Sequence, residues 1–263
     1  MRDRKAILLA LLALVTFLFA CQSEPTPVVT STPTITPLEI VSRSADAMLS
    51  VESLHFSIER DGALAYIDSG NLLAFKRAQG DFQAPDRMRA VIRVITAFTP
   101  VDMGMVALGD EQYTTDPITG EWGRLPPEWG QLDLVVIFDP ETGIQQLLKD
   151  GVIDLELVGM EEIDGRPQYR ISGRASGERM YDMTLGFIGQ GDVELDIWID
   201  AEDYYVRRLE IVDPVTDPED PTTWTLEFSN FGQAVEIEAP PVSYAPPALE
   251  YVRDMAAKVV EVW

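Results

Sequence analysis

Alternation of apolar and polar side chains is the feature that most restricts the fold of this chain. Residues 193–200 read Val-Glu-Leu-Asp-Ile-Trp-Ile-Asp, and successive side chains of a β-strand point to opposite faces, so this stretch predicts a strand with one apolar face. Strand patterns recur at residues 54–59, 70–81, 89–94, 101–107, 153–157, 169–173, 181–187, 207–211 and 223–228. Turn signals such as Asp164-Gly165 separate many of them. The pattern predicts one large antiparallel sheet of about ten strands.

Helical periodicity is confined to two short stretches of the main body. Residues 37–50 carry a stripe of Leu38, Val41, Ala45 and Met48. Asp139-Pro140 is typical of a helix start, and the helical spacing that follows ends before Gly151. The fold class is therefore α+β. Two short helices are too few to fill a large concave sheet, so we expect an apolar cavity between sheet and helices.

The N-terminal segment has the pattern of an export signal. Arg2, Arg4 and Lys5 precede the apolar run 6–19, and Cys21 follows Ala20. Fourteen helical residues reach about 21 Å, which is short of a hydrocarbon core of roughly 30 Å. The segment resembles a bacterial lipobox, which implies a lipid anchor on Cys21 after cleavage. Plain secretion and an uncleaved anchor are the alternatives.

These patterns predict four parts. Residues 1–20 form the signal peptide, and residues 21–37 form the lipidated cysteine and a Pro/Thr-rich tether that cannot bury enough apolar surface to fold. The sheet domain covers 38–240, and 241–263 form a C-terminal extension. Apolar residues of the extension share one helical face, which predicts a helix that packs on the domain or acts as a mobile lid; they are Leu249, Val252, Ala256, Val259 and Trp263.

The net charge and the lack of a catalytic motif argue against several classes of function. The net charge of −24 argues against a nucleic-acid partner and against electrostatic adsorption to anionic lipid. His55 is the single histidine and falls on the polar side of a strand, and no serine or cysteine has a nucleophile motif. The sequence therefore predicts no enzyme and no cofactor. The acidic residues of 213–220 lack the glycine and glutamate of an EF-hand, so we expect a solvated turn and no metal site; they are Asp213, Asp217, Glu219 and Asp220.

Several segments, taken in order, carry a family resemblance. They include Gly80-Asp81-Phe82-Gln83-Ala84-Pro85-Asp86-Arg87 and the strand at 193–200, and the others lie at 53–56, 108–113, 120–122, 138–144 and 158–165. Together they resemble the mycobacterial LppX/LprA/LprF/LprG lipoprotein family over about residues 38–240. The resemblance implies a half-barrel similar to the LolA/LolB carriers, in which a curved sheet wraps around helices that cover its concave face. It also implies an apolar pocket for acylated lipid or glycolipid.

The expected function is that of an extracytoplasmic lipoprotein, anchored to the outer face of the cytoplasmic membrane by Cys21, that carries such a lipid within the cell envelope. Its partners would be the lipid, the membrane and an unknown transporter or acceptor protein. Inward rows of central strands would line the pocket, and flexible methionines suit variable acyl chains. The candidate residues are Ile92, Val94, Met103, Met105, Met183, Leu185, Leu195 and Ile197. They also fit plain core positions, and the alternative function is that of a surface lipoprotein for adhesion or assembly.

Overall fold

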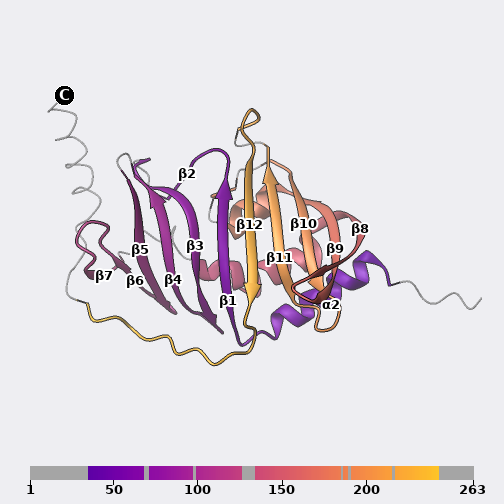
Figure 1. The fold of residues 1–263 in the computed structure, drawn as a ribbon, viewed down its shortest axis with the longest axis horizontal. Coiled ribbons are helices and arrows are strands. Elements are labelled where there is room, and N and C mark those ends of the chain that lie inside the picture. Colours follow the sequence, from indigo (N-terminus) through magenta and orange to yellow (C-terminus); the bar gives the residue numbers. More distant parts are fainter. Residues whose placement is uncertain are drawn as a thin grey trace, which may run out of the picture. The chain divides into compact units, whose positions relative to one another are not determined.

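A single antiparallel sheet dominates the computed structural model (Figure 1). The structure describes residues 35–67, 71–96, 99–125, 134–184, 186–188, 191–214 and 217–242. The predicted signal peptide, Cys21, the C-terminal helix and Leu185 lie outside the described residues, as does nearly all of the tether.

The sheet has twelve strands in one unclosed, curved layer (Figure 1). Its order is β7-β6-β5-β4-β3-β1-β12-β11-β10-β9-β8, and the short β2 pairs with β3 outside this path. The strands are β1 (Ser53–Asp61), β2 (Ala65–Tyr66), β3 (Ala74–Gln83), β4 (Arg87–Ile95), β5 (Pro100–Leu108), β6 (Glu111–Thr115), β7 (Trp122–Arg124), β8 (Val152–Ile163), β9 (Arg166–Ala175), β10 (Val193–Asp200), β11 (Val206–Asp213) and β12 (Thr222–Ser229). The predicted fold class, a large antiparallel sheet with few helices, is confirmed.

The first and last strands meet at the centre of the sheet. β1 pairs with β12 in a register that joins Phe56 to Phe228 and Ile58 to Leu226. Most other neighbours in the sheet are also neighbours along the chain, joined by turns such as Asp164-Gly165, whose φ angles are 52° and 75°. Alternation along each strand then places one row of apolar side chains on the concave side.

Helical elements cover that side behind the sheet (Figure 1). They are α2 (Pro37–Leu49), η2 (Leu134–Phe138), α3 (Ile144–Gln146), η3 (Leu147–Gly151) and α4 (Gly177–Met183). α2 confirms the predicted first helix: Thr36 caps it by accepting a hydrogen bond from the Glu39 amide at 3.2 Å, and Pro37 occupies its first turn. No helix among the described residues is both long and apolar enough to cross a membrane.

The second predicted helix begins later than expected. The Asp139 carboxylate accepts hydrogen bonds from the amides of Glu141 and Thr142, both at 2.9 Å, so it stabilises a turn instead of a helix start. α-Helical geometry begins at Ile144, and the helical segment includes Gly151, which the sequence predicts to lie just after its end.

The strand predicted at residues 181–187 is wrong. Gly177–Met183 is a helix, and Gly186, with a φ of 84°, turns the chain after it. Met180 and Met183 are both buried and lie three residues apart, which is the helical spacing. The sequence was read with a spacing of two residues, from Tyr181 to Met183. The buried residues of the structure follow the helical spacing of three, from Met180 to Met183.

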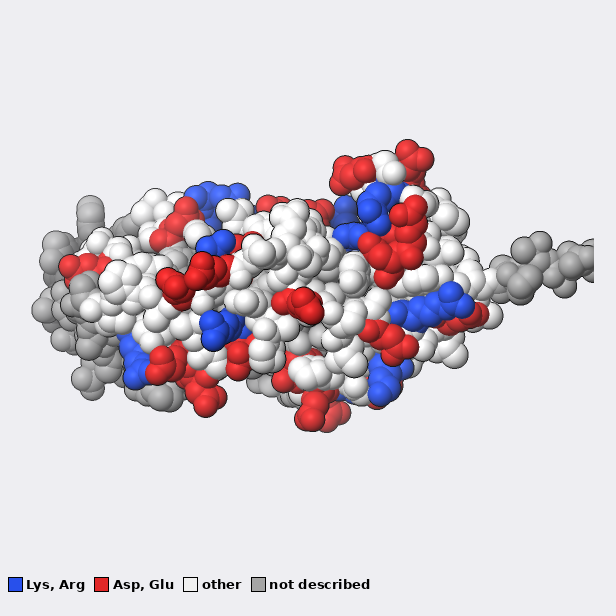
Figure 2. All heavy atoms as spheres, turned by 90° about the horizontal axis from the view of Figure 1, so that it is seen from below, with Lys and Arg blue, Asp and Glu red and all other residues white. Residues whose placement is uncertain are grey.

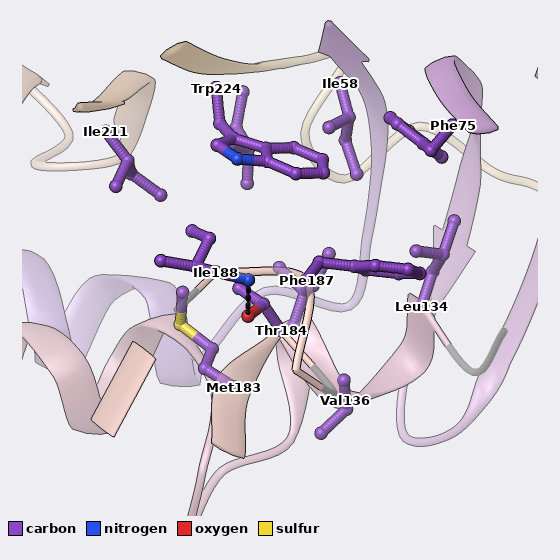
Figure 3. Close-up of a pocket in the computed structure, with 12 residues that line it drawn as sticks. Ile58, Phe75, Leu134, Val136, Met183, Thr184, Phe187, Ile188, Ile211 and Trp224 are labelled. Carbon is purple, nitrogen blue, oxygen red and sulfur yellow. Dashed lines mark hydrogen bonds between the residues drawn. The ribbon is translucent and has the colours of Figure 1, made fainter. Parts of the chain in front are cut away.

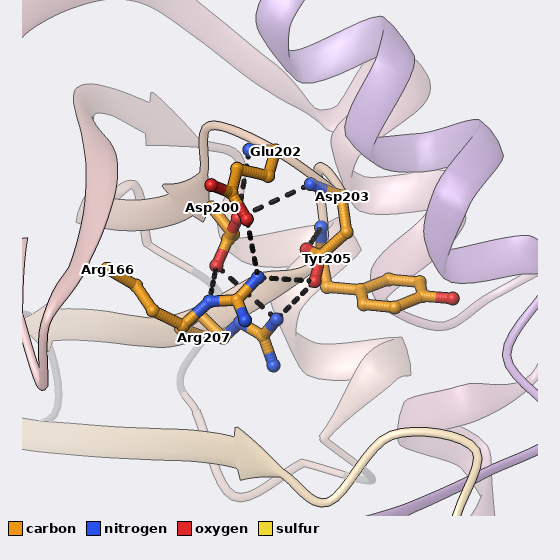
Figure 4. A network of polar contacts seen from close by, with 6 residues as sticks. All are labelled: Arg166, Asp200, Glu202, Asp203, Tyr205 and Arg207. Carbon is orange, nitrogen blue, oxygen red and sulfur yellow. Dashed lines mark hydrogen bonds and ion pairs between the residues drawn. The ribbon is translucent and has the colours of Figure 1, made fainter.

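A network of ion pairs closes the turn between β10 and β11 (Figure 4). The carboxylate of Asp200, which is 0% exposed, accepts hydrogen bonds from Arg166 and from the amides of Glu202 and Asp203. Arg207 bonds to Asp203 and lies 3.4 Å from Asp200. Burial alone would raise the pKa of Asp200, but these hydrogen bonds and the charge of Arg207 together lower it.

The chain after β12 runs as an extended strap along one end of the strands toward β7 (Figure 1). Ser53 donates a hydrogen bond to the Gln233 carbonyl at 2.6 Å. Ile237 of the strap packs with Val106 and Tyr113 in a small second core. Met105, next to Val106, belongs to the main core, so alternation places the second core on the convex face.

Candidate functional site

A small apolar cavity lies between the concave face of the sheet and the segments that cover it (Figure 3). Its volume is about 30 Å³. Its lining consists of Ile58, Phe75, Leu134, Val136, Ile137, Met183, Thr184, Phe187, Ile188, Ile211, Trp224 and Leu226.

Two groups of elements build this lining. Inward rows of the central strands β1, β3, β11 and β12 form one wall. η2 and the segment from Met183 to Ile188 form the other wall, and Figure 3 shows Ile188 and Phe187 facing Trp224 across the cavity. Segments that are distant in the sequence therefore meet here because the sheet curves around the helical layer.

Three aromatic rings dominate the cavity. The ring centroids of Phe75 and Trp224 are 5.4 Å apart, and those of Phe187 and Trp224 are 6.1 Å apart in a stacked arrangement. Phe75 and Phe187 complete the set at 6.1 Å. Such rings present large apolar surfaces with little flexibility, which suits contact with a hydrocarbon chain.

Two lining side chains carry polar atoms. The Thr184 hydroxyl donates to the Met180 carbonyl at 2.6 Å and accepts from the Ile188 amide at 3.1 Å. Trp224 is 5% exposed, and its indole Nε1 has no hydrogen-bond partner among the described residues. The lining therefore holds no charged group.

The predicted ligand residues fall into three groups. Met183 lines the cavity, on a helix and not on the expected strand. Six others are buried in the same core but lie outside the lining; they are Ile92, Val94, Met103, Met105, Leu195 and Ile197. Leu185 lies outside the described residues. The predicted roles of these eight residues stay predictions.

Sequence reasoning did not single out Phe75, Trp224 or Leu226 as lining residues. Alternation in 222–228 places Trp224 and Leu226 on one face of a strand, but it does the same for many core residues. The signal that distinguishes Trp224 is a polar atom on an apolar row. Its significance depends on the absence of a partner, which only the structure reveals.

The size of the cavity limits what it holds without rearrangement. Small-molecule pockets typically have volumes of roughly 300–1,000 Å³, whereas this cavity has room for about one water molecule. The helical elements thus fill the concave face more completely than the sequence suggests. An acyl chain requires the lining side chains to move apart.

A larger hollow of about 290 Å³ has charged walls. Side chains of β8, β9, β10 and β11 line it, including Asp154, Arg174, Glu194 and Glu210. Arg174 donates to Asp154 at 3.0 Å. Desolvating such charges against a hydrocarbon chain is unfavourable, so this groove is a poorer lipid site than the apolar cavity.

Ion pairs dominate the charged surface elsewhere. On the face in Figure 2, acidic and basic side chains lie in small adjacent groups separated by uncharged surface. Arg93 binds Asp102 through two hydrogen bonds, at 2.7 and 2.6 Å. This pairing disperses charge and forms no broad basic tract on that face.

The single histidine belongs to this paired surface. His55 Nδ1 lies 2.8 Å from Asp81, which also accepts from Arg89 at 2.8 Å. Burial would raise the pKa of Asp81, but the bonds from His55 and Arg89 lower it overall. No serine or cysteine hydrogen bond to His55 appears among the described residues, so the histidine has the setting of an ion-paired surface group.

The acidic residues of 217–220 lie in a local turn. Asp217 accepts from the amides of Glu219 and Asp220 at 3.0 and 3.3 Å, while Asp213 is buried at the end of β11. In the part of the chain that the structure describes, no group of three or more acidic, histidine or cysteine residues is arranged to hold a metal ion.

Structural comparison defines the class of fold. LprF from Mycobacterium bovis matches with a TM-score of 0.62 at 18% identity, covering 78% of this chain and 96% of that protein. LppX from Mycobacterium tuberculosis matches with a TM-score of 0.56 at 17% identity, covering 77% and 98%. The half-barrel lipoprotein fold predicted from the sequence is therefore shown.

Sequence comparison then identifies the family. The model of the LppX_LprAFG lipoprotein family matches residues 36–237, and this chain belongs to that family. Proteins named lipoarabinomannan carrier protein LprG, from M. tuberculosis (strain ATCC 25618 / H37Rv) and M. bovis (strain BCG / Pasteur 1173P2), are 22% identical over 242 residues. Each alignment covers 91% of this chain and 96% of the relative.

Proposed function

We propose that this protein is a membrane-anchored, extracytoplasmic carrier that binds an acylated lipid or glycolipid in the apolar cavity and moves it within the cell envelope. Family membership supports this assignment, and so does the carrier name of its relatives. The observation that carries the proposal is the cavity itself: twelve lining residues, none of them charged, under a curved sheet.

Opening of the cavity is a requirement of this proposal. Met183 ends α4, and Phe187 and Ile188 follow it before β10; together they form much of the wall opposite the sheet. Outward movement of these side chains would enlarge the cavity without disrupting the pairing of the strands. Burial gains about 0.8 kcal/mol per methylene, so one long acyl chain supplies enough free energy to offset such a rearrangement.

Transport would follow from the similarity of donor, pocket and acceptor. An acyl chain leaves one apolar environment for another, so the transfer free energy is nearly balanced and no covalent step is required. The tether after Cys21 would let the domain reach away from the membrane. Cleavage and lipidation at Cys21 are part of the proposal and are tested by mass spectrometry of the N-terminus.

Lipid uptake tests the carrier function. The purified full chain is incubated with vesicles of dioleoylphosphatidylcholine, recovered, and assayed by native mass spectrometry for bound lipid. Ile188→Trp adds bulk at the cavity wall and is expected to lower uptake by about tenfold, since it occupies the volume that a chain needs. Its matched control is Ile118→Trp, because Ile118 is 65% exposed in the β6–β7 turn.

Equal uptake by the two variants would contradict the assignment of this cavity. No uptake by the wild-type chain would contradict the carrier function itself.

A surface role in adhesion or assembly is the second candidate. The near-filled interior favours it, because a scaffold that holds no lipid needs no larger cavity. The purified chain would then carry no lipid and would bind a protein partner through its outer face. The same mass-spectrometric experiment separates the two functions.

A further inference from the structure

The indole N–H of Trp224 is buried in the cavity wall without a hydrogen-bond acceptor among the described residues. Buried tryptophan N–H groups usually have a partner, and each exception in a native structure calls for an explanation. Figure 3 shows this nitrogen on the part of the ring that lies toward Ile188 and Ile211. The unpaired donor therefore lies within the apolar wall, covered by its neighbours, and reaches a ligand once the lining side chains move apart.

Trp198 provides the comparison for Trp224, because it is the other buried tryptophan of the described residues with a described indole environment. Trp198 is also buried, and its Nε1 donates to Glu161 at 2.9 Å on the opposite face of the sheet. Arg170 and Arg208 flank its ring at 5.1 and 5.0 Å from the centroid. The fold thus provides an acceptor for one buried indole and none for the other.

A trapped water is a poor explanation for the unpaired donor. The cavity is large enough for about one water molecule, but a buried water needs two to four polar partners. Thr184 already uses its hydroxyl as donor to Met180 and as acceptor from Ile188. The Trp224 indole and the one remaining lone pair of the Thr184 oxygen would be its only side-chain partners within the described lining, which is the minimum a buried water needs, so the site does not favour it.

The chemistry of the lining restricts the acceptor that a ligand offers. A charged phosphate or carboxylate would be costly to bury here, because the lining supplies one neutral donor and no cation. A neutral carbonyl oxygen beside a hydrocarbon chain satisfies the donor and leaves the remaining contacts apolar. The ester group of an acyl lipid combines these two features.

We propose that Trp224 Nε1–H donates a hydrogen bond to the ester carbonyl of an acyl lipid held in the cavity, an inference that rests on the proposed carrier function. Trp224 thereby fixes the depth at which the acyl chain sits and distinguishes ester-linked from ether-linked lipids. An ether lipid of the same chain length offers equal apolar surface but no carbonyl, so it leaves the indole donor unpaired.

Paired ester and ether lipids test this inference. The purified full chain is exposed to mixed vesicles of dioleoylphosphatidylcholine and its ether-linked dioleyl analogue, and the bound lipids are quantified by native mass spectrometry. We expect the wild type to favour the ester by about fivefold, in line with one buried hydrogen bond. Trp224→Phe keeps an apolar ring without the donor and is expected to take up both lipids about equally.

Trp198→Phe is the matched control, since it removes an indole N–H from the other face of the sheet. It is expected to keep the ester preference. If Trp224→Phe does not fold, NMR of the ¹⁵N-labelled indole groups of the wild-type chain provides a second test. One indole signal is expected to shift downfield with the ester lipid and to stay in place with the ether lipid.

Uptake of both lipids without preference, together with an unmoved set of indole signals, would overturn the inference and leave the carrier function intact. Absence of any uptake would overturn the carrier function, and the inference with it.

Discussion

Two aromatic clusters on the same concave face differ in whether they border the cavity. The Phe138 cluster consists of Phe56, Phe82, Phe138 and Phe228; Phe82 stacks on Phe138 at 4.5 Å, and Phe56 and Phe228 lie at 5.9 and 5.8 Å from it. The Trp224 cluster consists of Phe75, Phe187 and Trp224, whose centroid distances run from 5.4 to 6.1 Å. The cavity borders the second cluster and none of the rings of the first.

The strands do not explain this difference, because β3 and β12 contribute rings to both clusters. The difference comes from the segment that covers each cluster. Phe138 enters the first cluster from η2 and is buried there, whereas Phe187 reaches the second from the loop after α4 and is only partly buried. One end of the concave face is therefore covered by a buried ring, and the other by a partly buried one, which under the proposed carrier function would be the cover that moves.

Truncation of the two covering phenylalanines tests this comparison most strongly. Phe138→Ala is expected to lower the free energy of unfolding by about 4 kcal/mol, because it leaves a void among packed rings. Phe187→Ala is expected to cost about 1 to 2 kcal/mol, since that ring borders existing space and surface. Urea denaturation measures both, and equal losses would contradict this difference between the two covers.

Acid is expected to act on the polar turn and on neither aromatic cluster. The folded-state pKa of Asp200 lies below its unfolded value of about 3.9, so its contribution to stability is present above that value and is lost as the pH falls through the folded pKa. Asp200→Asn is expected to cost about 2 to 3 kcal/mol at pH 7. Its unfolding free energy should also fall less steeply than that of the wild type below about pH 5.

Phe138→Ala provides the control for this titration because it removes no ionisable group. Its stability curve should run parallel to that of the wild type from pH 7 to pH 3. Parallel curves for Asp200→Asn and the wild type would show that the Asp200 network contributes nothing to the acid sensitivity.

The smallest effect on stability is expected at Trp224. In the absence of lipid, Trp224→Phe should stay within about 0.5 kcal/mol of the wild type, because loss of an unpaired donor offsets the lost ring contacts. Trp198→Phe should lose about 1 kcal/mol, since it breaks the bond to Glu161. Thermal denaturation of lipid-free protein compares them, and a larger loss for Trp224→Phe would identify its indole as a structural group.

Local sequence patterns predicted much of this fold. The stretch at 193–200 forms β10, the stripe at 37–50 forms α2, and Asp164-Gly165 turns the chain between β8 and β9. These features depend on neighbouring residues alone, through the strand period, the helical period and backbone conformations with positive φ. The stretch at 181–187 was misread because its first residues end the helix Gly177–Met183, whose buried spacing runs from Met180 to Met183.

The candidate site was less accessible to such reasoning. Alternation identifies which side of a strand is apolar, and it places Met105 and Leu195 on the inward rows as readily as Trp224. It does not reveal that α4 and the Phe187 loop lie opposite β12 while Met105 lies elsewhere in the same core.

The sequence by itself determined the period of the strands, the main turns, the first helix and the family to which the chain belongs. The tertiary structure alone decided that β1 pairs with β12, that a strap covers part of the convex face, and that the cavity lies beside an unpaired indole. The physical reason is the distance along the chain over which each interaction acts. Backbone preferences act over a few residues, whereas a cavity wall forms where segments more than a hundred residues apart meet, such as Phe75 and Phe187.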